Sequence, residues 1–391
     1  MRFIHTSDWQ IGAPFARIDD SDKRSIVRQA RIDAIKRIGA VAREQGAQFI
    51  LVAGDLFDSS SADKATVASA CSAIGQAGVP VIAIPGNHDN AGPGSVWEQD
   101  FFRREQAQLA PNLTILTQSG VYETDSAVIL ACPLVRRRVV IDPTEWLRDS
   151  EVYAGLSSEK PRIVLAHGSV QSFSATWEDE DDAGSAPNLI DLGRLPSAEV
   201  DYVALGDWHG TKQVSAIAWY SGTPETDRFP KGSGNEPGNV LAVEAARGSV
   251  PRVSRIPTAC LGWYDLSYEV SGDDEIGRLR GELVALLGQR AGEDLLRLSL
   301  RGVLGIEAYG ELERLIESLQ ARLLRLKLMN RIVLAPTDDE IEALTQGGSD
   351  PLITQVASKL VGVSKGDDER AADARVALRE LYRARLEEAA R

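Results

Sequence analysis

Five short stretches of the sequence place metal-type donors directly after runs of apolar residues. The side chains they supply are carboxylates, a glutamine, an asparagine and three imidazoles. Asp and Asn also favour turns, so any single stretch is weak evidence for a site. Five stretches that each follow a strand-like apolar run are better explained by one shared site, because ligands bind beyond the carboxyl ends of parallel strands. The stretches are HTSDWQIG (5–12), GDLFD (54–58), GNHD (86–89), AHG (166–168) and GDWHG (206–210).

The segments that must position these stretches alternate between strand-like and helical patterns. Residues 25–46 repeat apolar side chains at nearly the helical period, and residues 65–78 indicate a second helix that ends at a glycine. Apolar runs typical of buried strands precede the donors, within 47–55, 79–87, 162–168 and 200–210. Strand, helix and strand with glycines at the exits predict βαβ units, and therefore an α/β fold.

Length and composition limit the class of protein. The chain has 391 residues, which predicts two or three domains, and its 43% hydrophobic and 26% charged residues are typical of a globular protein. It contains no apolar run near the ~20 residues of a membrane-spanning helix, and its start reads directly into a strand without a signal peptide. We therefore expect a cytoplasmic protein. Cys71, Cys132 and Cys260 are far apart and are expected to be reduced.

The balance of charge bears on nucleic-acid binding. A formal net charge of −14 argues against a passive, non-specific binder of nucleic acid. It does not exclude an enzyme that draws a phosphodiester into a metal site, because bound cations reverse the local sign. The clearest basic clusters are Arg136 to Arg138 and Arg103 with Arg104. The triplet Arg136, Arg137 and Arg138 is explained equally well by a phosphate grip or by a half-exposed strand.

The sequence changes in character after residue 256. Strand-like segments at 263–271 and 295–303, an amphipathic helix at 311–326 and a closing strand at 331–336 predict a small α/β module. Beyond it the chain is helical and highly charged. The last helix has only a thin apolar stripe, so docking on a partner helix and packing on its own domain are both open. The acid-rich stretch 177–188 is expected to be a solvated loop rather than a substrate gate.

Taken together, the ordered stretches resemble the motif set of the calcineurin-like metallophosphoesterases. HTSDW, GDLFD and GNHD are similar to those of the SbcD family of DNA double-strand-break repair nucleases. The resemblance covers residues 5 to about 229, including YSGTPE at 220–225. It implies a four-layer αββα sandwich over 1–255, a small α/β capping domain over 256–336 and a C-terminal helical tail over 337–391.

The resemblance also implies two divalent metal ions that share one carboxylate. Asp55 would bridge; Asp8, Gln10 and His209 would complete one site, and Asn87, His167 and Asp207 the other. His88 resembles the general acid of the family, with Asp89 orienting it. Asp58 would support the site or brace its loop. His5, inside the strand pattern, is expected to be packed and hydrogen bonded. Arg136, Arg137, Arg138 and Tyr220 are candidate substrate contacts.

Two positions depart from the family pattern, which usually has histidine where Gln10 and Asp207 stand. The carboxylates of Asp8, Asp55 and Asp207 bring three negative charges, one more than the usual set. A site with fewer imidazoles and more oxygens should favour Mn²⁺ or Mg²⁺ over Zn²⁺. Because every predicted position still carries an oxygen or nitrogen donor, we interpret the site as working, with harder ligands and weaker metal affinity.

The resemblance predicts a manganese-dependent DNA nuclease, most simply an exonuclease in repair. Family members work with an SbcC-like coiled-coil ATPase, for which the charged terminal helices would be the docking element; a homodimer is also compatible with the sequence. Two alternatives remain. A phosphatase or small-nucleotide phosphodiesterase would use the same dimetal core, and a non-catalytic scaffold regulating an ATPase would explain Gln10 and Asp207 as decay. The presence of His88 argues against the scaffold.

Overall fold

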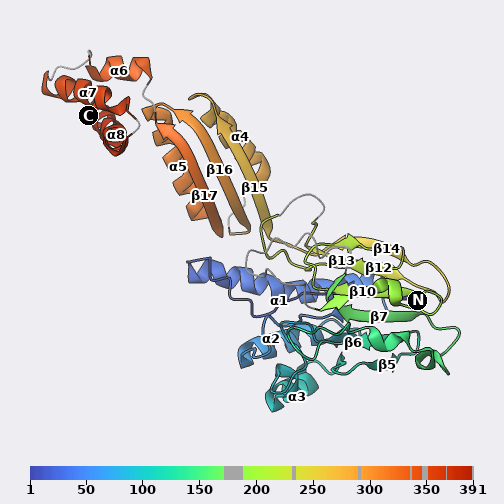
Figure 1. The fold of residues 1–391 in the computed structure, drawn as a ribbon. Helices are drawn as coiled ribbons and strands as arrows, with labels where there is room; N and C mark the ends of the chain where they lie inside the picture. Colours follow the sequence, from blue (N-terminus) through green and yellow to red (C-terminus); the bar gives the residue numbers. More distant parts are fainter. Residues whose placement is uncertain are drawn as a thin grey trace. The chain divides into compact units, whose positions relative to one another are not determined.

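The computed structural model describes residues 1–170, 188–230, 235–288, 292–334, 337–345, 351–366 and 368–389 (Figure 1). These residues form two compact units, Met1–Leu261 and Gly262–Arg391, which are considered one at a time. The predicted division into 1–255, 256–336 and 337–391 stays a prediction. Of the acid-rich stretch 177–188, only Asn188 lies within the described residues.

The first unit is built around two six-stranded sheets, which the alternating patterns predicted in part. In the first sheet β1 to β4 run parallel, and two antiparallel strands extend the sheet beyond β1. Its order is β14 (Arg252–Pro257), β13 (Asn239–Glu244), β1 (Arg2–Thr6), β2 (Ile50–Ala53), β3 (Val81–Ile84) and β4 (Leu113–Ile115).

The second sheet has four parallel strands between two antiparallel edge strands. Its order is β11 (Lys212–Gln213), β12 (Ala218–Tyr220), β10 (Tyr202–Gly206), β7 (Arg162–His167), β6 (Val128–Cys132) and β5 (Gly120–Glu123). A short parallel pair, β8 (Ser169–Val170) and β9 (Leu189–Ile190), follows β7. The pairing of β7 with β10 brings two donor-bearing strand ends side by side.

Three α-helices of this unit lie against the first sheet: α1 (Ser21–Glu44), α2 (Lys64–Gly75) and α3 (Asp100–Leu109). Helix α1 begins where the Asp20 carboxylate accepts the N–H groups of Asp22 and Lys23, and the Asp63 carboxylate caps α2 in the same way. Both helices were predicted from the 3.6-residue period. Short 3-10 helices occupy Val96–Glu98, Glu145–Arg148, Ser150–Tyr153 and Leu192–Arg194.

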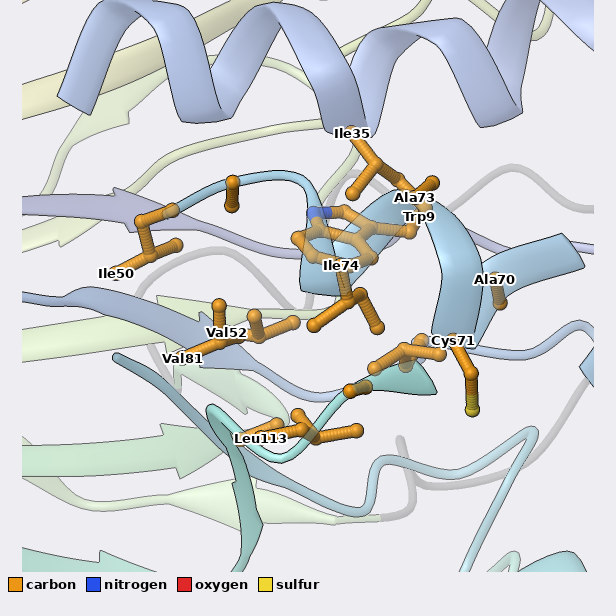
Figure 2. Close-up of a cluster of buried hydrophobic side chains, with 14 of the residues drawn as sticks. Trp9, Ile35, Ile50, Val52, Ala70, Cys71, Ala73, Ile74, Val81 and Leu113 are labelled. Carbon is orange, nitrogen blue, oxygen red and sulfur yellow. The ribbon is translucent and has the colours of Figure 1, made fainter. Parts of the chain in front are cut away.

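The core of the first unit consists of three apolar clusters, one for each gap between layers. Figure 2 shows the cluster between helices and first sheet, where Trp9 packs beside Ile35 of α1 and Ile74 of α2. A second cluster joins the facing surfaces of the two sheets, and a third packs Leu147 and Tyr153 of the 3-10 helices on the far face of the second sheet. Each fully buried large side chain contributes about 1.5–3 kcal/mol. These layers confirm the predicted four-layer α/β sandwich.

The second unit is a three-stranded parallel sheet with helices on one face. Strands β15 (Gly262–Val270), β16 (Asp294–Leu304) and β17 (Arg325–Leu334) pair in chain order, and α4 (Glu275–Leu287) and α5 (Ile306–Arg322) enclose its apolar cluster. Three further helices follow: α6 (Asp338–Thr345), α7 (Pro351–Ser364) and α8 (Glu369–Ala389). The small α/β module and the helical tail are both present, as predicted.

The apolar stripe of the last helix packs within its own unit. Leu378 of α8 is fully buried in a small cluster with Ile306 and Leu344, and Arg379 bonds Glu313 of α5 at 3.1 Å. The sequence left open whether this stripe docks on a partner helix or packs on its own domain, and in the structure it packs on its own domain.

Two smaller expectations concern cysteines and membranes. All three cysteines are free thiols, as predicted. None of the helices in the described ranges combines the length and the apolar character that crossing a bilayer requires.

Candidate metal centre

The ends of four parallel strands bring the predicted donors together. Asp8 follows β1 and Asp55 follows β2, its neighbour in the first sheet, while His167 ends β7 and Asp207 follows β10, neighbours in the second sheet. The loops are also bonded to each other, because the Gln10 N–H donates to the Asp55 carbonyl at 2.8 Å. Across the sheets, His167 Nδ1 lies 2.8 Å from the carbonyl oxygen of Ala53. Both sheets therefore present their carboxyl ends to one site.

The backbone at these donors is strained. Among the described residues, six that are not glycine have positive φ, and four of them are predicted ligands: Asp8 at 53°, Gln10 at 43°, Asp55 at 53° and Asp207 at 102°. Such residues cost roughly 1–3 kcal/mol each and persist where the surrounding structure enforces them. The packing is equally close, because a side chain at Gly86 would overlap Asp55 Oδ1. This geometry turns the side chains toward the site at the expense of stability.

His167 lies at the centre of one group of donors. Its Nε2 atom lies 3.6 Å from Asp55 Oδ2, 3.8 Å from Asp207 Oδ1 and 2.9 Å from the Asn87 amide. When the Asn87 side-chain amide is turned over, so that its nitrogen and oxygen exchange places, the nitrogen donates to Asp55 Oδ2 at 3.0 Å. The Ala53 carbonyl accepts the Nδ1 proton, which orients the ring so that Nε2 faces the two carboxylates and the amide.

Asp8 joins this group from the first strand. Ligand atoms of Asp8, Asp55 and His167 all lie within 4.8 Å of one another, and all three side chains are buried. The Asp8 carboxylate also accepts the Ser7 hydroxyl at 2.5 Å and the Asp207 N–H at 3.2 Å. Buried carboxylates this close repel each other unless a positive charge lies among them.

The pKa values of Asp8, Asp207 and His167 reflect burial together with this repulsion. Burial raises the pKa of Asp8, and the Asp55 carboxylate raises it further against the opposing effect of nearby imidazoles. Burial also raises the pKa of Asp207. For His167, burial disfavours the charged form, but Asp55, Asp8 and Asp207 outweigh it and raise the pKa to about 9. In the metal-free protein the imidazolium of His167 therefore supplies the positive charge that this group requires.

His209 and Gln10 form the second group of donors. Gln10 Nε2 lies 3.2 Å from His209 Nε2, so the two predicted ligands adjoin. On the outer side, His209 Nδ1 lies 2.7 Å from Asp227 Oδ2. Burial opposes ionisation of this carboxyl, but His209, Arg228 and Arg31 hold the pKa of Asp227 well below its usual range. Asp227 therefore fixes the ring, with Nε2 directed at Gln10.

Sequence reasoning missed two of these supporting residues. Asp227 belongs to a polar loop without periodicity, and no local signal marks it. Arg31 is buried in α1 and donates to the carbonyls of Trp9 at 2.7 Å and Asp8 at 3.0 Å, which stabilises the strained turn. A charged residue four positions after Val27 and four before Ile35, on the apolar face of the helix, was an available signal for it.

His88 is oriented by a different residue from the one predicted. Its ring Nδ1 lies 2.9 Å from the Asp58 carbonyl oxygen and 3.8 Å from the Asp58 carboxylate. The backbone N–H of His88 donates to Asp55 Oδ1 at 2.9 Å. Asp89 instead accepts the N–H groups of Phe57 at 3.0 Å and Gly86 at 2.7 Å. The prediction that Asp89 orients His88 is wrong, because its fully buried carboxylate is used by the loop backbone.

Three further predictions can be compared with the structure. His5 is buried and bonded to the Tyr202 hydroxyl at 3.0 Å, as expected of a packed histidine. Tyr220 is not a surface contact: it is buried, and its hydroxyl donates to the Gly168 carbonyl at 2.8 Å and accepts the Val170 N–H at 3.0 Å. Arg136, Arg137 and Arg138 are exposed in a loop after β6, which excludes the half-exposed strand as their explanation.

Divalent cations suit this arrangement on chemical grounds. The inward groups are carboxylates, whose oxygens hard cations prefer, two side-chain amides, and imidazole nitrogens whose other ring atom is held by an outward partner. The two groups meet at Asp8, whose pKa is influenced by both His167 and His209. These side chains therefore form a candidate site for a divalent cation, with Asp8, Asp55 and His167 as its closest cluster.

Two curated relatives resemble part of this chain. The SbcD subunits of the nuclease SbcCD from Escherichia coli K12 and from Escherichia coli O157:H7 are each 26% identical over 261 residues, which is 57% of this chain and 60% of theirs. The chain thus spans less than two thirds of these relatives. The solved structure of TT1561 from Thermus thermophilus aligns with 12% identity and a TM-score of 0.38 over 66% of this chain and 98% of its own, and we base no conclusion on it.

The family assignment rests on a separate match. Residues 1–222, which include all seven predicted ligands, match the calcineurin-like phosphoesterases. This match covers more than half of the chain and contains both donor groups described above. The chain therefore belongs to the calcineurin-like phosphoesterase family.

Proposed function

We propose that this phosphoesterase is a manganese-dependent DNA nuclease that acts as an exonuclease. The observation that supports it best is the convergence of Asp8, Asp55 and His167 within 4.8 Å at the ends of strands from both sheets. Similarity to a nuclease subunit favours a nucleic-acid phosphodiester as substrate over a phosphate monoester.

Each donor group would hold one divalent cation. Asp55 would be shared by both positions; Asn87, His167 and Asp207 would complete one, and Asp8, where the two groups meet, would complete the other with Gln10 and His209. Two bound cations neutralise the phosphate and activate water near neutral pH. The protein residues fix the donors in place: Ala53 orients His167, Asp227 orients His209, and Arg31 holds the Asp8 turn. With oxygen donors in the majority, Mn²⁺ or Mg²⁺ should bind in preference to Zn²⁺.

His88 is the proposed general acid. Its side chain is 31% exposed, whereas the predicted ligand His167 is fully buried, so substrate can reach the His88 ring. The Asp58 carbonyl accepts the Nδ1 proton at 2.9 Å, which leaves Nε2 to protonate the departing sugar oxygen. The nearby Asp58 carboxylate stabilises the protonated ring.

The substrate and the partner form the remaining part of the proposal. Arg136 to Arg138 are exposed beside the loop that carries His88, where they can contact backbone phosphates. The relatives are named as a subunit, which supports a partner; we infer a coiled-coil ATPase bound by the C-terminal helices. Those helices expose Leu352, Val356, Val363 and Val376 by 66%, 41%, 46% and 50%. Loss of ATPase capture on deleting 337–391 would support this assignment, and unchanged capture would contradict it.

A comparison of substrates tests the enzymatic proposal. Purified protein is freed of metal, reloaded with Mn²⁺ and given linear duplex DNA, single-stranded DNA, bis(4-nitrophenyl) phosphate and 4-nitrophenyl phosphate. We expect DNA and the diester to be hydrolysed and the monoester to be poor. A preference for the monoester would instead indicate a phosphatase.

Substitution at His88 distinguishes an enzyme from a scaffold. His88→Gln should slow DNA cleavage by about 10²–10⁴-fold, as expected when a general acid is removed. The control is His5→Gln, which changes a buried histidine away from the proposed chemistry. Unchanged activity in His88→Gln would favour a non-catalytic protein with contaminating nuclease.

A further inference from the structure

The loop of residues 135–141, between β6 and the 3-10 helix at Glu145–Arg148, combines exposed apolar and basic side chains. Val140 is fully exposed at 101%, Ile141 is 66% exposed and Val135 is 49% exposed. Single exposed apolar residues are common on protein surfaces. Here three of them flank Arg136 to Arg138 within seven residues, in a chain whose net charge is −14.

The start of this loop is bonded to the segment that carries Asn87 and His88. Leu134 donates its N–H to the Pro85 carbonyl at 3.1 Å and accepts the Ala91 N–H at 2.9 Å. These two bonds enclose the GNHD stretch from both sides. Any molecule that contacts the start of the loop is therefore close to the proposed general acid.

The middle of the loop is held by Asn188. The buried amide of Asn188 donates to the Arg137 carbonyl at 3.1 Å and accepts the Val139 N–H at 2.8 Å. Its backbone carbonyl accepts the Ser169 N–H at 3.1 Å, two residues after His167. Asn188 has a positive φ of 60°, and in this conformation its side-chain amide and its backbone carbonyl both reach their partners. The loop is thus anchored beside the metal centre on a second side.

The end of the loop is fixed by Asp142. Its carboxylate accepts the Thr144 N–H at 2.8 Å, the Asp191 N–H at 3.1 Å and an Arg148 N–H at 2.5 Å. A loop anchored at its start, middle and end holds its exposed side chains in place. The exposure of Val140 and Ile141 is therefore maintained by the structure, because none of these anchors lets the segment fold back onto the core.

We propose that the 135–141 loop is a wedge that separates the terminal base pairs of a DNA duplex as one strand enters the metal centre. The arginines contact backbone phosphates, and Val140 and Ile141 insert against the exposed face of a base pair, as apolar side chains do when they unstack DNA. This proposal rests on the proposed nuclease function. It assigns duplex opening to residues other than the predicted ligands and His88.

Cleavage of DNA ends that differ only in pairing tests the wedge. The double variant Val140→Ser/Ile141→Ser is compared with wild type on a blunt duplex, on the same duplex with a mismatched, already open end, and on bis(4-nitrophenyl) phosphate. We expect roughly tenfold slower cleavage of the blunt end and nearly unchanged rates on the other two substrates. Val250→Ser is the matched control, since Val250 is 72% exposed on the turn between β13 and β14.

The outcomes separate failure of the wedge from failure of the nuclease proposal. Equal cleavage of blunt ends by wild type and the double variant would overturn the wedge alone, as would an equal loss on blunt and open ends. If wild type hydrolyses the small diester but no DNA, the nuclease proposal fails and the wedge fails with it. Because Ser replaces exposed residues, the melting temperature should be unchanged.

Discussion

His167 lies within 3.8 Å of Asp55 and Asp207 on one side of the metal centre, whereas on the other side His209 has a glutamine amide 3.2 Å from its Nε2. We call the first side, with Asn87, the acidic half and the second side the amide half. In the acidic half buried carboxylates repel each other, and without a cation the imidazolium of His167 offsets their charge. The amide half has fewer charges and depends on Asp227 to orient its imidazole.

In the proposed dimetal site, the two cation positions would therefore differ in character. Removing a charge from the acidic half should lower the rate of DNA cleavage. The amide half should lose function when its support is removed, and it should change its metal preference when its donor changes. Three substitutions test these statements, in order of decreasing effect, and a fourth concerns stability alone.

The largest effect is expected at the bridging position. Asp55→Asn removes one charge from between both cations, and DNA cleavage should fall by roughly a thousandfold or more. The rate is measured at saturating Mn²⁺. The matched control is Asp125→Asn, an exposed carboxylate in the turn between β5 and β6 that is outside the proposed site. A similar loss in both variants would contradict a special role for Asp55.

The second effect concerns the support of the amide half. Asp227→Asn removes the charged partner of His209 Nδ1, and Mn²⁺ affinity should fall by about 10–100-fold, as for other residues that orient metal-bound histidines. Calorimetric titration of the metal-free protein measures it. Asp63→Asn, at the exposed cap of α2, is the control. If binding of both cations were unaffected by Asp227→Asn, the amide half would need no such support.

The third effect is a change of metal preference rather than a loss. Gln10→His restores the more usual imidazole, and affinity for Zn²⁺ should rise about tenfold relative to Mn²⁺ because the site becomes softer. Competition titrations of the two metals measure the ratio. A wild-type protein that already prefers Zn²⁺ would contradict the oxygen-rich site that we infer.

The smallest effect is on stability alone. Burial lowers the pKa of His5 to about 3, from about 6.5 in the unfolded chain. Between these values the unfolded state binds the proton and the folded state does not, so this residue costs up to about 1.4 kcal/mol of stability per pH unit as the pH falls below 6.5. Chemical unfolding of wild type and His5→Gln at pH 7 and pH 5, with a chelator present, should show a shallower loss in the variant. Equal losses would mean that His5 is protonated in the fold.

Much of this arrangement was predictable from the sequence, and the reasons are local. Strand-like runs followed by Asp8, Asp55 or His167 place donors at strand ends, and hydrophobic period alone indicated α1 and α2. The partners of His88 were not predictable. Asp58 and Asp89 both belong to motifs beside the site, and only the fold decides that Asp89 accepts backbone N–H groups.

Support from distant segments was also beyond sequence reasoning. Asp227 reaches His209 across 18 residues that include the short strands β11 and β12, and Asn188 bonds a loop 49 residues earlier. Tyr220 was predicted beside the site from its motif, yet it is buried, because its hydroxyl satisfies two backbone groups around Gly168. Contacts of this kind depend on which loops meet, and no periodic pattern encodes that.

Anomalous scattering from crystals soaked in Mn²⁺ tests the central assignment most directly. We predict two peaks that share the Asp55 carboxylate, one beside Asn87, His167 and Asp207 and the other beside Asp8, Gln10 and His209. A single peak, or two peaks neither of which touches Asp55, would contradict the paired centre on which the proposed chemistry depends.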